Sequence, residues 1–235
     1  MKTLIIVSHP ELANSGTQSF LRAATRYLDA VTWHGLDADY PDFAINVQKE
    51  QQLLSTADRI IFQFPLYWYS SPALLKKWQD DVLTRNFTYR DQDGMLAGKQ
   101  LGIVMTLGNP LKNYVAGGFE GVSISELVKP YQAIAKQAGM DFLPPFTVDQ
   151  FSYMTAAQKA RLLSDYQNYI ANPTPFSFNG KQKWLIQRLR AKAARIDDQQ
   201  QRTLLNLTID QIENNGDELD ALKDQIAMIK RGDDE

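Results

Sequence analysis

The segment with the most distinctive chemistry in this sequence lies between two prolines. Residues 63–72 read QFPLYWYSSP, so three aromatic residues follow one another directly after an apolar run. Water is an unfavourable neighbour for such rings. A flat apolar ligand ring would cover them, and backbone N–H groups would bond its polar edge. An aromatic loop packed on its own domain or on a subunit interface fits the same pattern. The candidate ligand contacts of this segment are Pro65, Leu66, Tyr67, Trp68 and Tyr69.

A second segment, residues 9–18, joins an apolar run to the expected start of a helix. Free backbone N–H groups at a helix N-terminus favour an anion. Gly16 is the only glycine here, and no Walker motif or GxGxxG is present, which argues against a nucleoside triphosphatase and a Rossmann dehydrogenase. A simple helix cap at Asn14 or Ser15 explains the same residues without a ligand. The candidate phosphate contacts of this segment are His9, Ser15, Thr17 and Gln18.

A third segment follows another apolar run. Gly108 permits a close approach of the backbone to a ligand, and Tyr114 could place a hydroxyl over the site. An ordinary turn that contains glycine is the alternative interpretation. The candidate contacts here are Thr106, Leu107, Gly108 and Asn109, with Tyr114 as the candidate catalytic residue.

The elements that must position these segments alternate along the first 170 residues. Strands are expected at 4–8, 31–34, 59–64, 100–107 and 140–148, and helices at 14–28, 47–54, 72–83, 124–138 and 155–170. This alternation predicts βαβ units in a flavodoxin-like three-layer sandwich, with a five-stranded parallel sheet of order 2-1-3-4-5. The three segments then meet at the carboxyl edge of strands 1, 3 and 4. Together they suit a mononucleotide with a flat ring, such as a flavin.

The composition excludes several other kinds of site. The 235 residues include no cysteine and only two histidines, which excludes disulfides, iron–sulfur clusters, a cysteine nucleophile and the common zinc sites, so no metal is expected. The 25 basic and 27 acidic side chains give a formal charge of -2, which argues against nucleic-acid binding. The apolar N-terminal run is too short for a secretion signal, and no run approaches the roughly 18 residues of a membrane span. A cytoplasmic protein is expected.

Three motifs carry a resemblance to a known family. Residues 62–69 (FQFPLYWY) with 72–78 (PALLKKW) are the most specific of them, followed by His9-Pro10 with Ser15, and by Gly139-Met140 with 143–145 (LPP). At these residues the chain resembles the flavodoxin-like NAD(P)H:quinone oxidoreductase family of the flavodoxin-2 type. That family includes the ancillary oxidoreductases of bacterial potassium efflux systems. The resemblance covers about residues 1–170.

The resemblance implies a bound flavin and two-electron transfer from NADPH or NADH to a quinone or a similar electrophile. It also implies a homodimer. FMN is favoured over FAD because no adenine-binding element is evident, and FAD is left open as the alternative. Tyr114 matches a family tyrosine near the flavin, and Gln18 stands where an Asn is usual in the flavin-phosphate turn. The chain departs from the family pattern in two places: residues 106–109 read TLGN in place of TTGG, and no histidine follows His34 to pair with Tyr114. The second departure concerns the route of proton transfer and the preference for quinones.

The composition changes after residues 172–175 (NPTP), which places a flavin-binding domain at 1–175 and a helical extension at 176–235. Residues 181–195 are basic and contain no acid. A first apolar seam repeats every seven residues at Leu205, Ile212, Leu219 and Ile226, and a second contains Leu222 and Ile229. Residues 214–216 (NNG) predict a break in this helix.

The extension leaves two roles open. Its helices could pack on the same chain or on a dimer mate, or the basic stretch could contact a membrane surface or a partner protein. The second reading motivates an alternative function, in which the chain binds flavin as a regulatory or ancillary protein with little turnover. A one-electron carrier is less favoured, because such carriers dock through strongly acidic faces.

Overall fold

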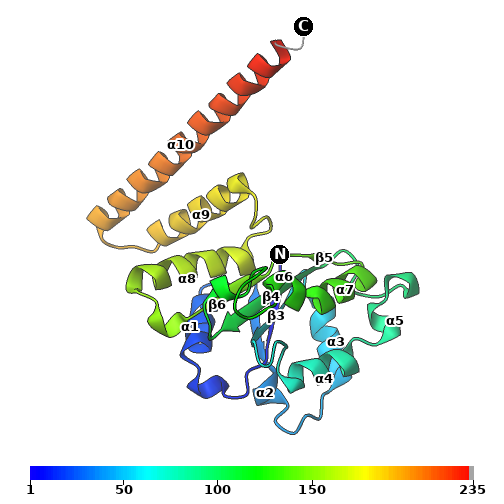
Figure 1. The fold of residues 1–235 in the computed structure, drawn as a ribbon. Helices are drawn as coiled ribbons and strands as arrows, with labels where there is room; N and C mark the ends of the chain where they lie inside the picture. Colours follow the sequence, from blue (N-terminus) through cyan, green and yellow to red (C-terminus); the bar gives the residue numbers. More distant parts are fainter. Residues whose placement is uncertain (233–235) are drawn as a thin grey trace. The chain divides into compact units, whose positions relative to one another are not determined.

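The structure is a computed structural model, and it describes residues 1–232. The chain divides into two compact units, one comprising residues 1–171 and the other beginning at Asn172. The first unit is an α/β sandwich and the second is helical (Figure 1). Among the described residues, no helix is both long enough and apolar enough to cross a membrane.

A parallel sheet forms the middle layer of the first unit. Its order is β2-β1-β3-β4-β5, and β6 also pairs with β4, which confirms the predicted order of the sheet. The predicted fifth strand is split into two short pieces, because Pro144 and Pro145 have no N–H to donate to a ladder. The strands are β1 (Thr3–Val7), β2 (Val31–Gly35), β3 (Arg59–Pro65), β4 (Gln100–Leu107), β5 (Asp141–Phe142) and β6 (Phe146–Asp149).

The helices of the first unit cover both faces of this sheet. They are α1 (Gly16–Thr25), α2 (Leu36–Asp39), α3 (Val47–Thr56), α4 (Ala73–Val82), α5 (Arg85–Thr88), α6 (Ile124–Leu127), α7 (Lys129–Ala138) and α8 (Ala156–Ala171). Short 3-10 turns lie between them at η1 (Leu12–Asn14), η2 (Arg90–Gln92), η3 (Leu111–Asn113) and η4 (Phe151–Tyr153).

Two hydrophobic cores result, because neighbouring residues of a strand point to opposite faces. Leu4 and Ile6 pack with α3, α4 and α7, whereas Ile5 and Val7 pack with α1 and α8. All four of these side chains are buried. The apolar run of β1 thus feeds both cores, which explains its lack of alternation. Figure 1 shows α1 and α8 on one side of the sheet and α3, α4 and α7 on the other.

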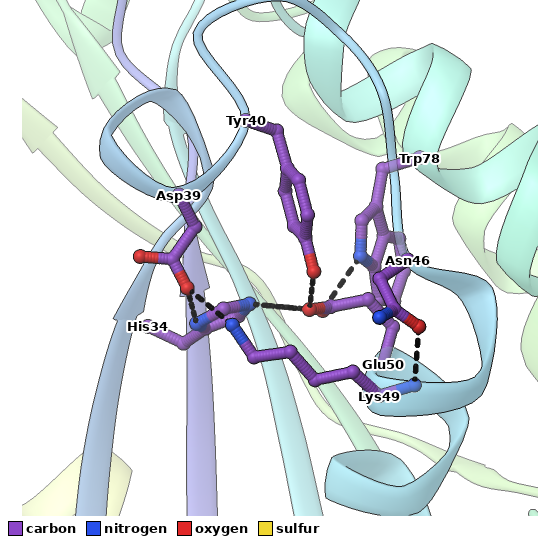
Figure 2. Close-up of polar contacts among 7 residues, drawn as sticks. All are labelled: His34, Asp39, Tyr40, Asn46, Lys49, Glu50 and Trp78. Atoms are coloured by element: carbon purple, nitrogen blue, oxygen red, sulfur yellow. Dashed lines mark hydrogen bonds and ion pairs between the residues drawn. The ribbon is translucent and has the colours of Figure 1, made fainter.

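A buried carboxylate ties α3 to α4 and to the segment after β2 (Figure 2). Glu50 is fully buried and accepts hydrogen bonds from Trp78 Nε1 at 2.8 Å and Tyr40 Oη at 2.6 Å. His34 Nε2 lies 2.9 Å from Oε2, the oxygen that Trp78 also contacts, and 3.0 Å from Oε1. Burial alone raises the pKa of the Glu50 carboxyl, but the bonds from His34, Tyr40 and Trp78 outweigh burial and hold the pKa below its ordinary value. Glu50 therefore anchors Trp78 as a carboxylate.

The second unit contains α9 (Phe178–Ala193) and α10 (Gln199–Gly232), which pack against each other. The predicted helix break at residues 214–216 is wrong, because α10 continues through them. Gly216 faces Gln182 of α9 so closely that a Cβ would overlap its amide, and that amide donates to Ile212 O at 2.6 Å. The glycine therefore serves close helix packing, and the packing offsets its low helix propensity. Arg190 also joins the two helices, through both carboxylate oxygens of Glu213.

Candidate functional site

The three sequence segments meet at the carboxyl edge of the sheet. The parallel register pairs Val7 with Gln63 and Pro65 with Thr106. Beyond these pairs, Ser8 N donates to Gln63 O at 3.1 Å and Leu66 N donates to Thr106 O at 2.9 Å. The segments that follow β1, β3 and β4 therefore leave the sheet at the same level. Ligands of open parallel sheets bind at this kind of edge.

The aromatic loop is a tight two-residue turn in an unusual conformation. Tyr67 and Ser70 exchange two backbone hydrogen bonds of 3.0 Å each. The residues between them, Trp68 and Tyr69, have φ values of 48° and 60°. A left-handed backbone costs roughly 1–2 kcal/mol at a residue other than glycine. Turns of this type are usually built from Asn and Gly instead. The strain at two adjacent bulky residues points to a function for this loop.

Burial does not offset that strain. The Trp68 side chain is 95% exposed, and Tyr67 and Tyr69 are about half exposed. Within this chain the loop is therefore not packed on its own domain. A ligand or a partner surface remains as the cover for the three rings.

His9 links the first segment to this loop. Its ring meets the Tyr67 ring edge-on, with centroids 6.4 Å apart. Burial lowers the pKa of His9, although the nearby Asp37 and Glu11 carboxylates raise it in part. Glu11 N donates to His9 Nδ1 at 3.1 Å, so the neutral ring carries its proton on Nε2. His9 therefore offers a neutral donor rather than a fixed positive charge.

Ser15 caps α1, as one of the two sequence interpretations expected. Its hydroxyl oxygen accepts from Gln18 N at 3.2 Å. The observed helix thus begins two residues later than predicted, at Gly16. Thr17 lies half-buried in the first turn. The cap leaves the hydroxyl proton of Ser15 for another acceptor.

Gln18 is the most informative residue of this turn, because half of its amide has no partner. The side chain is almost fully buried, and its Oε1 accepts from Gln63 Nε2 at 2.6 Å. Its Nε2 has no hydrogen-bond partner among the described residues, and neither does the buried Ser8 hydroxyl. Gln18 and His9 also line a cleft of about 480 Å³. Buried polar groups are normally paired, so these two atoms call for an additional acceptor or donor.

The third segment is linked to the aromatic loop by a residue that the sequence interpretation did not single out. Glu120 accepts from Asn109 Nδ2 at 2.8 Å and from Tyr69 Oη at 2.9 Å. Nothing in its spacing marks Glu120, because the chain returns to the site only through the loop after η3. Space remains beside Gly108, where an added Cβ would have no neighbour within 4 Å.

Tyr114 lies behind this link. Its side chain is 7% exposed. Burial raises the pKa of Tyr114, the Glu120 charge raises it further, and a hydrogen bond with Asn109 opposes them in part. The hydroxyl is therefore protonated at neutral pH and able to donate.

The predicted backbone donors of the aromatic loop need one correction. Leu66 N and Tyr67 N are already bonded within the chain. In the described part of the chain, the N–H groups of Trp68, Tyr69 and Gly108 make no such bond, so they are the donors left for a ligand.

The model of the Flavodoxin_2 family, described as a flavodoxin-like fold, matches residues 1–170. The chain belongs to this family. The match ends before α9, so the Flavodoxin_2 family accounts for the sheet and its edge and not for the second unit.

Two solved structures are similar to this chain in sequence and fold. An NADPH-quinone reductase from P. pentosaceus is 48% identical with a TM-score of 0.69, and the alignment covers 73% of this chain and 99% of that one. General stress protein 14 from Treponema denticola, solved in complex with FMN, is 37% identical with a TM-score of 0.67 and coverages of 72% and 98%.

A curated relative has a name of a different kind. The glutathione-regulated potassium-efflux system ancillary protein KefG of Serratia proteamaculans is 38% identical over 178 residues, covering 74% of this chain and 95% of that protein. Relatives of this Flavodoxin_2 chain are thus named both as reductases and as an ancillary protein.

The residues of this edge fit a flavin mononucleotide. The unpaired Gln18 Nε2 suits a phosphate or ribose oxygen, because either would satisfy a buried donor. The exposed rings of the aromatic loop suit a flat ring, and the free N–H groups beside them suit its polar edge.

Proposed function

We propose that this chain is a flavin-dependent NAD(P)H oxidoreductase that binds FMN at the carboxyl edge of its sheet. It passes a hydride from NADPH or NADH, by way of the flavin, to a quinone or a similar electrophile. In this proposal residues 1–175 form the flavin-binding domain, and the helical extension begins at residue 176.

One observation carries this proposal. Trp68 and Tyr69 hold a strained left-handed turn while their rings remain exposed beside unpaired backbone donors. Backbone strain of this kind is found mainly where it serves a function. A ligand that contacts both the rings and the N–H groups would supply that function. The FMN complex of the Treponema denticola relative and the name of the P. pentosaceus reductase support the choice of ligand and donor.

Each segment has a role in binding. Tyr67, Trp68 and Tyr69 hold the flavin ring and exclude water from one side of it. The N–H groups of Trp68, Tyr69 and Gly108 face its polar edge, where fixed donors stabilise added negative charge without reorganising. The bound FMN supplies the two-electron chemistry that the side chains of this protein lack.

The phosphate end is held by the turn after β1. Gln18 Nε2, the hydroxyls of Ser15 and Thr17, and the N-terminus of α1 donate to it. His9 adds a neutral donor between this turn and Tyr67. Pro65 and Leu66 lead into the loop, and Thr106 and Asn109 would border the flavin from β4, while the buried Leu107 supports this edge from the hydrophobic core.

Tyr114 is the proposed catalytic residue. Its buried hydroxyl stays protonated and can hydrogen-bond the acceptor while a proton is delivered. His9 and His34 are the only histidines in the sequence, and both lie on the other side of β3, so no Tyr–His pair operates. A homodimer is also proposed, in which a second subunit lies near the exposed rings.

Steady-state turnover tests the activity against the alternative function. FMN-loaded protein is mixed with NADPH or NADH and with a series of quinones and other electrophiles. Many turnovers per flavin with at least one acceptor are expected. A flavin that is reduced once and then turns over with none of them would favour a flavin-binding ancillary protein, the reading to which the KefG relative lends weight.

A further inference from the structure

The last part of α10 carries an apolar stripe that α9 does not cover. Lys223 Nζ of α10 lies 5.9 Å from the ring of Phe178, the first residue of α9. Because α9 begins at Phe178, the part of α10 described after Lys223 extends past the start of α9. Leu222, Ile226 and Ile229 are each more than half exposed. Exposed apolar side chains in a row on one helix indicate a contact surface.

The spacing of this stripe is that of a coiled coil. Leu219 and Ile226 are seven residues apart and occupy the a positions of two heptads. Leu222 and Ile229 occupy the d positions, three residues after each of them. Leucine and isoleucine at a and d form the seam of paired helices. A stripe of this width suits one facing helix better than a broad core face.

We propose that a second copy of this chain covers the stripe, with the two α10 helices forming a short parallel coiled coil. The proposal does not depend on the proposed electron transfer. It gives the helical extension a purpose, which is to join two flavin-binding domains through a two-fold axis.

Charge favours the parallel direction. The same heptads place Glu218 at g and Lys223 at the following e position. In a parallel pair each g residue faces the next e residue of the partner, so Glu218 meets the lysine of the other copy. In an antiparallel pair g faces g and e faces e, which removes this attraction. One residue pair thus appears twice in the symmetric contact.

A membrane surface is a poorer occupant for the same stripe. Residues 217–231, which contain the whole stripe, carry four carboxylates, on Asp217, Glu218, Asp220 and Asp224, and three cations, on Lys223, Lys230 and Arg231. Helices that lie on anionic membranes have basic polar faces instead. With more carboxylates than cations, this part of α10 lacks the basic face that anionic membranes attract.

A cysteine cross-link tests the proposal, because the sequence contains no cysteine and one introduced thiol is unique. Leu222→Cys places the thiol in the seam at d. Asp224→Cys is the matched control, two residues away at the outward f position. Each full-length variant is incubated in a glutathione redox buffer, in which oxidised glutathione accepts the two electrons as two thiols lose their protons and form a disulfide. Covalent dimer is followed on non-reducing gels.

The expected result is that Leu222→Cys cross-links at least about tenfold faster than Asp224→Cys, because pairing raises the local concentration of the seam thiols. Lys223→Glu in the Leu222→Cys background should slow the reaction. A second protein carries Glu218→Lys in the same Leu222→Cys background. An equal mixture of the two proteins should restore the rate of cross-linking, because residue 218 of each copy then meets a residue 223 of opposite charge.

Equal rates for the two cysteine variants would overturn the proposal, because the thiol in the seam would then be no closer to its counterpart than the outward one. Protection of Leu222→Cys by vesicles of anionic lipid, with no covalent dimer in their absence, would also overturn it in favour of a membrane surface.

Discussion

Gln63 on β3 donates a hydrogen bond of 2.6 Å to the side-chain carbonyl of Gln18 on α1. The direction of this bond follows from a third residue, because Tyr166 Oη donates to Gln63 Oε1 at 2.7 Å. Gln63 can then present only its NH₂ group to Gln18. Gln18 therefore accepts this hydrogen bond through its side-chain oxygen, and its own NH₂ group is left without a partner among the described residues. A relay of three buried side chains thus keeps one donor free beside the turn that follows β1.

Replacing Gln18 by leucine removes that free donor, and it also removes the oxygen that accepts the hydrogen bond from Gln63 Nε2. We expect the dissociation constant for FMN to rise about tenfold or more, and the apoprotein to lose roughly 1–3 kcal/mol because Gln63 is left unpaired. Fluorescence titration and urea unfolding measure the two effects. Gln167→Leu is the control, since Gln167 Nε2 ties α8 to α1 through Ala24 O at 2.8 Å, away from the edge of the sheet. Equal FMN affinities for the two variants would remove Gln18 from the site.

Two substitutions at Trp68 separate its ring from its backbone. Alanine removes the ring but keeps the strain, whereas glycine removes both. Both variants should bind FMN roughly tenfold more weakly, because a stacked aromatic contributes about 1–3 kcal/mol. Trp68→Gly should also be more stable than Trp68→Ala by about 1 kcal/mol, the cost of a left-handed backbone. Unchanged FMN affinity in both variants would mean that the loop does not hold the ring.

Tyr114→Phe tests the proposed proton donor. Turnover with quinones should fall by tenfold or more, in line with the contributions of about 10²–10⁴ made by general acids, while FMN affinity stays the same. Because burial raises the pKa of Tyr114 above its ordinary value of 10.0, the wild-type hydroxyl stays protonated through the neutral pH range. Tyr153→Phe, at a tyrosine that is 82% exposed, is the control. Unchanged turnover across several acceptors would leave Tyr114 without a catalytic role.

Glu50 makes the stability of the first domain depend on pH. Its pKa is lowered in the folded protein, so its contribution is complete above the ordinary value of 4.5 and is lost as the pH falls through the lower folded value. Glu50→Gln leaves His34, Tyr40 and Trp78 with a poorer acceptor. It should cost roughly 2–4 kcal/mol at neutral pH, and the difference from wild type should shrink below pH 4.5.

Urea unfolding at a series of pH values measures this dependence. Glu11→Gln, at an exposed glutamate, should match the wild type throughout. A Glu50→Gln protein whose loss of unfolding free energy stays constant from neutral pH to well below pH 4.5 would show that the Glu50 charge contributes nothing.

Trp78 lies on α4, which begins directly after the aromatic loop, so the same variant should also weaken FMN binding.

The sheet was predictable because its strands are buried on both faces. Residues 4–8 and 59–64 are continuous apolar runs without the alternation of a half-exposed strand, so they indicate strands buried on both faces. The helices between these runs imply parallel strands joined by crossover connections. The continuous α10 was not predictable. By its local sequence Gly216 predicts a break in the helix. The structure shows instead that Gly216 leaves room for Gln182 of α9, a contact that the local sequence does not indicate.

The candidate site was predictable as a place and less so as a set of contacts. Three segments at the ends of three strands must share an edge. The left-handed turn at Trp68 and Tyr69 contradicts local propensity, so no sequence rule indicates it. Glu120 reaches Tyr69 across 51 residues of chain, and no spacing rule predicts such a contact.

The central claim is that this edge of the sheet binds a flavin that NAD(P)H reduces. The most direct test is the absorption spectrum of the purified protein, before and after one equivalent of NADPH or NADH is added without oxygen. We expect the bands of an oxidised flavin, identified as FMN after heat release, and their bleaching within seconds by at least one donor. A colourless protein that takes up neither FMN nor FAD would contradict it.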